Sequence, residues 1–521
     1  MRLVDGPPSS RTRPPRSESA PPPSLTADYP CPVNPDDASS FAPAQRRMLT
    51  ALLIPLFLAL LSVSIVNVAL PALQAGLGAS SADLQWVLAG YTLTFGVVLV
   101  AAGRAGDLWG RKPIFLVGIA LFTLGALVSG FSVSPAMVNA ARLATGVGAG
   151  LFNPQIIGVI QSEFSGRARG RAYGLFGTVI GLAVAVGPLL GGVLMQALGP
   201  DWGWRGAFLV NVPVGVLAFV MAVLWLPADT RSTATARPLS LRALDPAGVV
   251  LLGAATVLLM VPFILRSAWW LLAPAAVLFL AWWLWEKRVK RTAPRTGVEP
   301  MVDPGLFRRP SFTYGAVGSS LFLATMPGIF AVITLFLQQG LHETALLAGL
   351  MTVSTAVVVS LMSPWVGARV DRHGPVYAVL GAGMGVVAMA LLAVAFVPIA
   401  EGRWPAWTIA VILLLQGAAQ AFYLTSVQVL MMSDVQGREA GAAGGVSQTM
   451  QRVGSALGLA IVTGVFFGTL AAAGGAPSPA DYGHAGRLAM TVVAVSWAGT
   501  LVVCLLDLAR RRRVRPEATA A

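Results

Sequence analysis

The chain carries the stretch Gly103-Arg-Ala-Gly-Asp107-Leu-Trp-Gly110 after its second long apolar segment. The same spacing recurs in its later half as Gly367-Ala-Arg-Val-Asp371-Arg-His-Gly374. Each copy follows the second of a set of six apolar segments, so residues 48–226 and 312–508 are interpreted as two copies of a six-helix unit. Duplicated halves of this kind are typical of secondary transporters, whose substrate site lies between the halves near the middle of the membrane.

The composition indicates a membrane protein with many spans. The chain has 521 residues, of which 56% are hydrophobic and 11% charged, and its mean hydropathy is +0.73. Soluble globular proteins contain about 25% charged residues, and a membrane helix needs about 20 apolar residues. Because the apolar excess extends over most of the chain, both a soluble fold and a single membrane anchor are excluded.

Fourteen apolar segments, separated by short polar breaks, are predicted to be transmembrane helices. The seventh and eighth lie between the two copies and are interpreted as an insertion. Their tryptophan pairs at 269–270 and 282–283 are interpreted as belts at the membrane interface. The segments are 48–72, 84–105, 113–131, 136–161, 171–198, 206–226, 244–265, 267–285, 312–337, 344–366, 376–398, 406–432, 440–468 and 486–508.

The expected fold is an all-α polytopic membrane protein of two six-helix bundles plus two inserted helices. An N-terminal tail is expected to be disordered because residues 1–45 contain 11 of the 36 prolines and no apolar run. The predicted parts are a cytoplasmic tail (1–46), a first bundle (47–227), the inserted helices with their flanking loops (228–311), a second bundle (312–509) and a basic cytoplasmic tail (510–521).

The 36 Lys and Arg against 22 Asp and Glu give a net charge of +14. These basic residues occur in short runs between apolar segments rather than on one folded face, so binding to nucleic acid is not expected. If the N-terminus lies inside the cell, 30 of the 36 basic residues lie inside and only four lie in outside loops. Since cytoplasmic loops carry the excess of Lys and Arg, both termini are predicted to be cytoplasmic.

Six stretches in order carry a family resemblance. They are residues 66–71 (VNVALP), 103–112 (GRAGDLWGRK), 142–150 (RLATGVGAG), 187–192 (GPLLGG), 204–215 (WRGAFLVNVPVG) and 438–454. Together they resemble the motifs of the major facilitator superfamily, and specifically of its fourteen-helix drug:proton antiporter branch. The resemblance covers about residues 48–509 and implies the major facilitator fold and multidrug efflux.

The loop after the second helix is predicted to be a conformational latch. An acid at the negative end of a helix dipole needs a partner, and Arg111 and Lys112 are near Asp107 in sequence. The resemblance implies that this acid also caps the helix that starts near residues 437–441. The alternative is a basic loop that only sets topology. The predicted latch residues are Gly103, Asp107, Gly110, Arg111, Lys112, Asp371 and Gly374.

The fifth segment carries the second predicted motif. Its small residues let helices approach closely, and a proline removes one backbone hydrogen bond. The resemblance implies a tight seam that favours antiport, whereas the alternative is ordinary helix packing. The residues are Gly177, Gly181, Gly187, Pro188, Gly191 and Gly192.

Two arginines lie within predicted helices and are candidates for substrate binding or coupling. Arg142 in the fourth helix should pair or face water, because a charge inside a membrane is costly, although it lies close enough to the helix end to snorkel. Arg452 in the thirteenth is equally interpreted as a structural tie to backbone carbonyls. Relatives usually carry an acid in the first helix where this chain has Ser62, so neutral or anionic substrates become more plausible and proton coupling less certain.

Other polar side chains are candidates for lining a central cavity, with hydrogen bonds between helices as the alternative. They are Asn67, Asn153, Gln155, Gln416, Gln420 and Tyr423.

These observations predict a monomeric exporter of drugs or small metabolites in the plasma membrane, working by alternating access and proton antiport. The alternatives are a facilitator, an exporter of neutral or anionic metabolites without the usual acid, and a sensor that does not transport. No cluster of polar side chains indicates an enzyme, and no stretch indicates a sugar importer or an ATP-binding loop. Two cysteines and three histidines lack the spacing of a metal site, so no metal or cofactor is expected.

Overall fold

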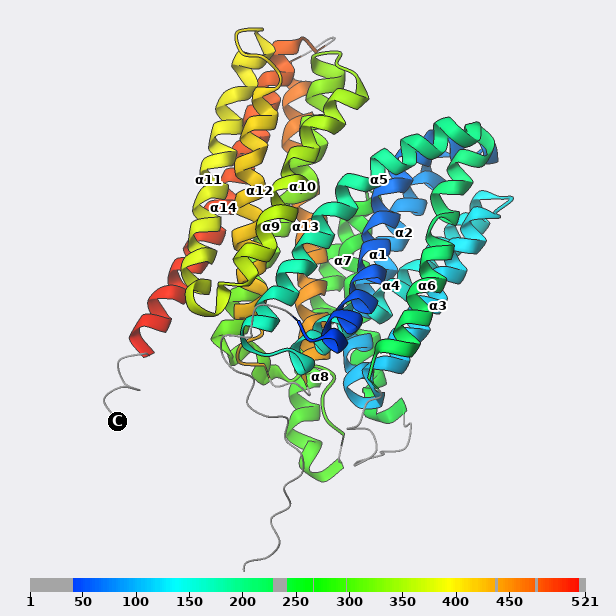
Figure 1. Ribbon diagram of the computed structural model, residues 1–521, viewed down its shortest axis with the longest axis vertical. Helices are drawn as coiled ribbons and strands as arrows, with labels where there is room; N and C mark the ends of the chain where they lie inside the picture. Colours follow the sequence, from blue (N-terminus) through cyan, green and yellow to red (C-terminus); the bar gives the residue numbers. More distant parts are fainter. Residues whose placement is uncertain are drawn as a thin grey trace, which may run out of the picture. The chain divides into compact units, whose positions relative to one another are not determined.

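Figure 1 shows the computed structural model of the protein. It describes residues 41–227, 241–265, 267–296, 298–435, 439–473 and 477–514, which all belong to one unit that starts at Phe41. Most of the predicted N-terminal tail therefore lies outside the described residues, and α1 begins within its last part, at Pro43. At the other end α14 continues to Val514, so the first basic residues of the predicted C-terminal tail are helical.

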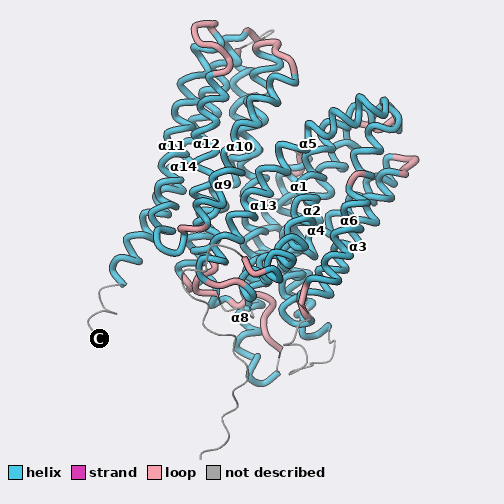
Figure 2. Tube along the Cα trace, in the orientation of Figure 1, coloured by secondary structure: helices cyan, strands magenta, loops and turns pink. Residues whose placement is uncertain are grey.

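The described chain is helical, and no strand occurs among the described residues (Figure 2). Fourteen described helical segments are long and apolar enough to cross a membrane, which confirms the predicted number. The helices are α1 (Pro43–Leu77), α2 (Ser81–Trp109), α3 (Arg111–Gly130), α4 (Pro135–Glu163), α5 (Gly166–Leu209), α6 (Asn211–Trp225), α7 (Pro246–Leu265), α8 (Leu272–Thr296), α9 (Pro310–Leu335), α10 (Ala345–Gly367), α11 (Val370–Ala400), α12 (Thr408–Met431), α13 (Ala440–Ala472) and α14 (Pro479–Val514).

One helical element contains more than one span. α5 runs on to Leu209 across a break at Gly199, whose φ of +73° is a conformation that glycine adopts readily. The candidate spans divide at this break into Gly166–Gly199 and Asp201–Trp225, and the second of these includes α6.

Helices α1–α6 and α9–α14 form two bundles with separate hydrophobic cores. The first core contains rings such as Phe115, Phe122 and Phe152, and the second contains Phe322 and Trp497. Helices α7 and α8 do not join either core. They pack against both bundles through a third cluster that includes side chains of α2, α4, α9 and α13.

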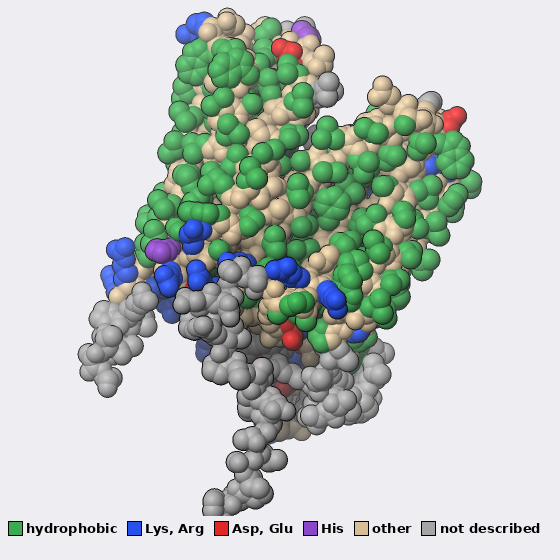
Figure 3. All heavy atoms as spheres, in the orientation of Figure 1, with side chains coloured by type: hydrophobic (Ala, Val, Ile, Leu, Met, Phe, Trp, Pro, Cys, Tyr) green, Lys and Arg blue, Asp and Glu red, His purple; other side chains and the backbone are tan. Residues whose placement is uncertain are grey.

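Basic side chains gather at one end of the helices, which is called the basic end here and is defined by Arg111, Lys112, Arg169, Arg369 and Arg511 (Figure 3). The ends of α2, α4, α10 and α12 and the starts of α3, α5, α11 and α13 lie there. The opposite end carries the remaining ends of these helices, and Figure 3 shows the two bundles parted at that end.

The two bundles touch along two seams in the half that contains the basic end. On the α2–α13 seam, a Cβ at Gly103 would overlap the carbonyl of Gly441. On the α5–α10 seam, Gly170 and Gly367 approach each other in the same way. These positions require glycine because a larger residue would force the backbones apart. The bundles are therefore closed against each other at the basic end and separated at the other.

Candidate functional site

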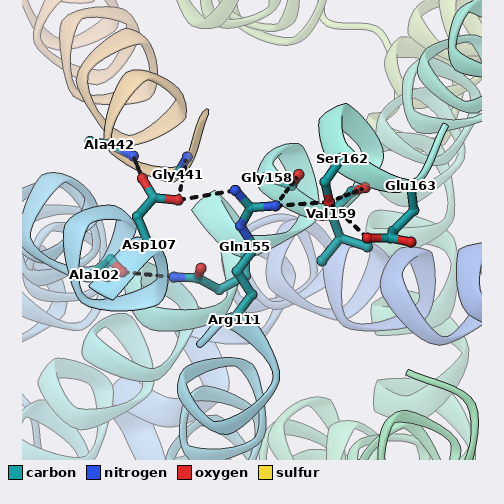
Figure 4. Close-up of polar contacts among 10 residues, drawn as sticks. All are labelled: Ala102, Asp107, Arg111, Gln155, Gly158, Val159, Ser162, Glu163, Gly441 and Ala442. Carbon is teal, nitrogen blue, oxygen red and sulfur yellow. Dashed lines mark hydrogen bonds and ion pairs between the residues drawn. The ribbon is translucent and has the colours of Figure 1, made fainter. Parts of the chain in front are cut away.

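The α2–α13 seam contains a network of polar contacts centred on Asp107 (Figure 4). The backbone N–H of Gly441 donates to its Oδ1 at 3.2 Å, and the N–H of Ala442 donates to its Oδ2 at 2.9 Å. These two amides belong to the start of α13, where the helix dipole favours a negative charge. The side chain of Asp107 is 1% exposed, so the carboxylate of one bundle caps a helix of the other within a nearly dry interface.

Arg111 supplies the countercharge for this carboxylate. Its Nη2 lies 3.1 Å from Asp107 Oδ1, and its Nη1 donates to the carbonyl of Gly158 at 2.6 Å and to Ser162 Oγ at 2.9 Å. The arginine can reach these groups because α2 ends at Gly110, whose φ of +98° turns the chain directly into α3. The contact predicted from the resemblance is therefore present in the structure.

Other predicted latch residues have different surroundings. Lys112 Nζ donates to the carbonyls of Val223 and Leu226 at the end of α6, at 2.8 and 2.7 Å. Asp371 lies beside the start of α5, with Oδ2 3.7 Å from the position of a Cβ at Gly166, and makes no hydrogen bond among the described residues. The two copies of the repeat thus face corresponding helix starts, but only Asp107 makes hydrogen bonds to one.

Gln155 and Gly374 each make contacts within their own bundle. Gln155 Nε2 donates to the carbonyl of Ala102 at 2.8 Å and therefore ties α4 to the end of α2 (Figure 4). Gly374 packs against Leu430, which belongs to α12. Gln155, for which the sequence left open a cavity position or a hydrogen bond between helices, is buried within the first bundle and makes a bond of the second kind in this conformation.

The α5 motif is divided between two neighbours. Gly177 and Gly181 face α10 of the second bundle, where they lie close to Ser363 and Ser360. Farther along, Gly187 and Gly191 face Ser64, Ile65 and Val68 of α1, while Gly192 has open space beside it.

Pro188 leaves a backbone group of α5 without its usual donor. Because proline has no N–H, the carbonyl of Val184 lacks its hydrogen bond within the helix. Ser64 Oγ donates to this carbonyl at 3.2 Å. A hydroxyl from α1 thus satisfies the group that the proline frees, and this contact holds the kinked part of α5 against α1.

Arg142 and Ser62 are adjacent in the structure. Arg142 is 1% exposed, its Nη1 donates to Ser62 Oγ at 2.9 Å, and its Nε donates to the carbonyl of Val87 at 2.9 Å. Its Cζ lies 4.4 Å from the centre of the Tyr91 ring. The serine that replaces the usual acid is therefore a direct hydrogen-bond partner of this arginine, and carbonyl and ring contacts complete its surroundings.

Arg452 reaches from the second bundle to α2. Its Cζ lies 4.4 Å from the centre of the Phe95 ring, and it makes no hydrogen bond or ion pair among the described residues. The alternative prediction of a tie to backbone carbonyls is therefore not what this conformation shows.

The remaining predicted cavity residues divide by exposure. Asn67 is exposed, with its Nδ2 donating to the carbonyl of Val63 in its own helix, and Gln420 is half-buried. Asn153 and Gln416 are buried. Tyr423 is fully buried, and its ring packs between Phe322 and Trp497 in the core of the second bundle.

A pair of buried carboxyl groups was missed by the sequence interpretation. Asp245 and Glu286 are 4% and 0% exposed, and both approach the position of a Cβ at Gly248. Trp285 Nε1 donates to Asp245 at 2.9 Å, and Trp282 Nε1 donates to Glu286 at 3.0 Å. The interpretation of Trp282 as part of an interface belt was wrong, because its indole is buried against this carboxyl group. The sequence carries one signal of this contact, because Trp282 lies four residues before Glu286 and therefore on the same helix face.

Comparison with known proteins identifies the class of the molecule. The family model described as Major Facilitator Superfamily matches residues 52–245 and 240–459. The protein belongs to this family of membrane transporters. The likeness to two solved structures agrees with the fold: the human organic anion transporter MFSD10, with a TM-score of 0.60 and 16% identity over 89% of this chain and all of that one, and the proton:xylose symporter XylE, with a TM-score of 0.60 and 12% identity over 87% and 94%.

Relatives more similar in sequence belong to the drug-exporter branch of this family. A probable actinorhodin transporter of Streptomyces coelicolor is 31% identical over 89% of this chain and 80% of its own length. The puromycin resistance protein of Streptomyces alboniger is 32% identical over 84% and 85%. A multidrug resistance protein, Stp, of Mycobacterium tuberculosis is 30% identical over 80% and 75%. The predicted family and branch are confirmed.

Proposed function

We propose that this protein is a monomeric secondary exporter that moves drugs or small metabolites out of the cell by alternating access, in exchange for protons. The contact of Asp107 with the start of α13 carries this proposal, because it joins the two bundles at one end only. A transporter that closes one end while the other is open needs a contact that can form and break as a unit. The names of the relatives, which include resistance proteins, support export and drugs as the class of substrate.

The basic end is assigned to the cytoplasm, since cytoplasmic loops of membrane proteins carry the excess of Lys and Arg. In that orientation both termini are cytoplasmic, and the structure represents a state closed to the cytoplasm. The end at which the bundles are parted then faces the outside of the cell, where an exported molecule is released.

A second candidate differs in its coupling. Ser62 accepts a hydrogen bond from Arg142 and cannot bind or release a proton in the physiological range. This observation favours an exporter of neutral or anionic compounds that does not use an acid in α1. The two candidates share the fold and the latch, and they differ in the response of transport to the proton gradient.

The test is accumulation of puromycin and rhodamine 6G in cells that lack their own main exporters, with and without this protein and a protonophore. Proton antiport predicts lower accumulation that the protonophore reverses. Lower accumulation that resists the protonophore favours the second candidate. Asp107→Asn should abolish the effect, whereas Asp83→Asn, which removes a charge at the other end of the same helix, should not. Unchanged accumulation of a panel of drugs in cells that express the folded protein would refute export. The remaining hypothesis would then be a membrane sensor that does not transport.

A further inference from the structure

Two arginines from opposite bundles flank one pair of aromatic rings. Arg142 of α4 lies over Tyr91, and Arg452 of α13 lies over Phe95, each with Cζ 4.4 Å from the ring centre. Tyr91 and Phe95 are one turn apart on α2, and their ring centres are 6.0 Å apart. The Tyr91 hydroxyl donates to the carbonyl of Ala59 at 3.0 Å. Two positive charges, one from each bundle, therefore lie against neighbouring rings of α2.

Neither charge is neutralised by an acid. No ion pair of Arg142 or Arg452 with Asp or Glu occurs among the described residues, although six other basic side chains there make one. Arg142 donates to Val87 and Ser62, whereas the one polar or ring contact of Arg452 within the described parts of the chain is the face of Phe95. An arginine in a membrane interior normally pairs or faces water, and a ring face replaces only part of its lost hydration. An anionic group beside Arg452 would supply the pairing that an arginine in this environment normally has.

Arg452 lies where such an anion can arrive. Between residues 440 and 451, α13 is buried almost without interruption between the bundles, and Thr449 Oγ1 donates to the carbonyl of Gly96 at 3.2 Å. From Arg452 onward most residues of α13 are partly exposed or exposed. Arg452 is itself partly exposed and lies where the continuous burial of α13 ends. Arg142 lies behind the ring pair and is fully enclosed.

We propose that Arg452 binds an anionic group of the exported molecule, a carboxylate or a phenolate, and that Arg142 strengthens this binding as a second positive charge behind Tyr91. The exported molecules would then include organic anions, which a site with a helix-one acid would repel. Because Phe95 and Arg452 belong to different bundles, separation of α2 from α13 frees the guanidinium group, so its availability changes with the conformation. This inference rests on the proposed export function, and it concerns the charge of the substrate.

The test uses the purified full-length protein and two dyes with the same tricyclic ring system. Fluorescein is an anion at neutral pH and rhodamine 6G is a cation, and binding of each is followed by fluorescence anisotropy. Arg452→Gln should weaken fluorescein binding by at least about tenfold, because the charged partner of the anion is lost. Arg452→Lys should retain part of the affinity. The matched control, Arg487→Gln, removes an exposed charge at the opposite end and should leave binding unchanged.

The outcomes separate this inference from the proposed function. Equal fluorescein binding by the wild type and Arg452→Gln, or preference of the wild type for rhodamine 6G, would overturn the anion site while export of rhodamine 6G from cells could continue. Loss of fluorescein binding in Arg452→Gln alone, in a protein whose melting temperature is unchanged, supports the site even where no export is measured. If Arg452→Gln does not fold, the comparison passes to Arg452→Lys, which must bind fluorescein more weakly than the wild type.

Discussion

Replacement of Asp107 by Asn tests the latch with almost no change in shape. The carboxylate accepts two backbone N–H groups of α13 and pairs with Arg111, and its side chain is nearly unexposed. The amide of Asn keeps one acceptor but places an NH₂ group where the second oxygen was, so one N–H of α13 meets a donor. Arg111 keeps Gly158 and Ser162 but loses its countercharge.

The magnitude follows from these losses. A hydrogen bond to a charged group is worth about 1.5–3 kcal/mol, and a charge at a helix start about 0.3–2 kcal/mol. These contributions overlap, so the closed state should lose about 2–4 kcal/mol relative to the open one. Since 1.4 kcal/mol is tenfold, the ratio of the two states should shift about 30- to 1,000-fold.

The assay is the distance between spin labels across the basic end. Cysteines at Ser165 and Ser433, which are exposed and belong to different bundles, can carry the labels. Asp107→Asn should move the distance distribution to longer values and reduce transport, with expression unchanged. Asp83→Asn should leave both as in the wild type, because the hydrogen bonds that this acid makes to described residues all go to Ser80 at the start of its own helix. An unchanged distance and full transport in Asp107→Asn would show that this loop sets the membrane topology and does not act as a latch.

Three further outcomes are expected. Gly441→Ala should also open the basic end, because its Cβ would lie 2.5 Å from the Gly103 carbonyl. Gly192→Ala should transport normally, because open space lies beside that residue. Normal transport by both variants would show that close packing of α2 against α13 is not needed for transport. Ser64→Ala should lower the free energy of unfolding by about 1 kcal/mol, measured by thermal denaturation, and Pro188→Ala should remove this penalty by restoring the helix N–H. An impermeant thiol reagent should label Ser478→Cys from outside the cell and Ser433→Cys only in opened membranes, in a chain lacking Cys31; equal labelling would contradict the proposed orientation.

The helices and the latch could be predicted from the sequence for different reasons. Hydropathy over about 20 residues is a strong local signal, and it gave fourteen spans. The Asp107 contact joins residues more than 300 positions apart, so it came from the family resemblance and not from the local pattern. Hydropathy placed the helix ends less well. α8 continues past 285 to Thr296, because a run of charged residues ends the apolar signal without ending the helix.

The site chemistry was harder to predict because it depends on which face of a helix a polar residue occupies. Gln155 and Gln420 are both amides within apolar segments, yet the first binds a carbonyl inside its bundle and the second is half-buried. Likewise, nothing in the spacing of Arg452 and Phe95 indicates that they meet. Glu286 lies at the edge of its apolar segment and was therefore interpreted as a loop residue, although the fold buries it against Trp282.

The two copies of the repeated stretch also show why similar sequences act differently in the two seams. Asp107 is buried and bonds to the first amides of α13, whereas Asp371 is exposed beside the start of α5 and makes no hydrogen bond among the described residues. An exposed charge contributes at most about 1 kcal/mol, because water screens it. The α5–α10 seam is therefore held by the close approach of Gly170 and Gly367, which depends on their lack of side chains and not on charge. Opening the basic end must break the contacts of one buried carboxylate, Asp107 on the α2–α13 side, and expose it to water, and closing must desolvate it again. That side also carries Arg452, so release of the Asp107 contact and exposure of the proposed anion site involve the same pair of helices.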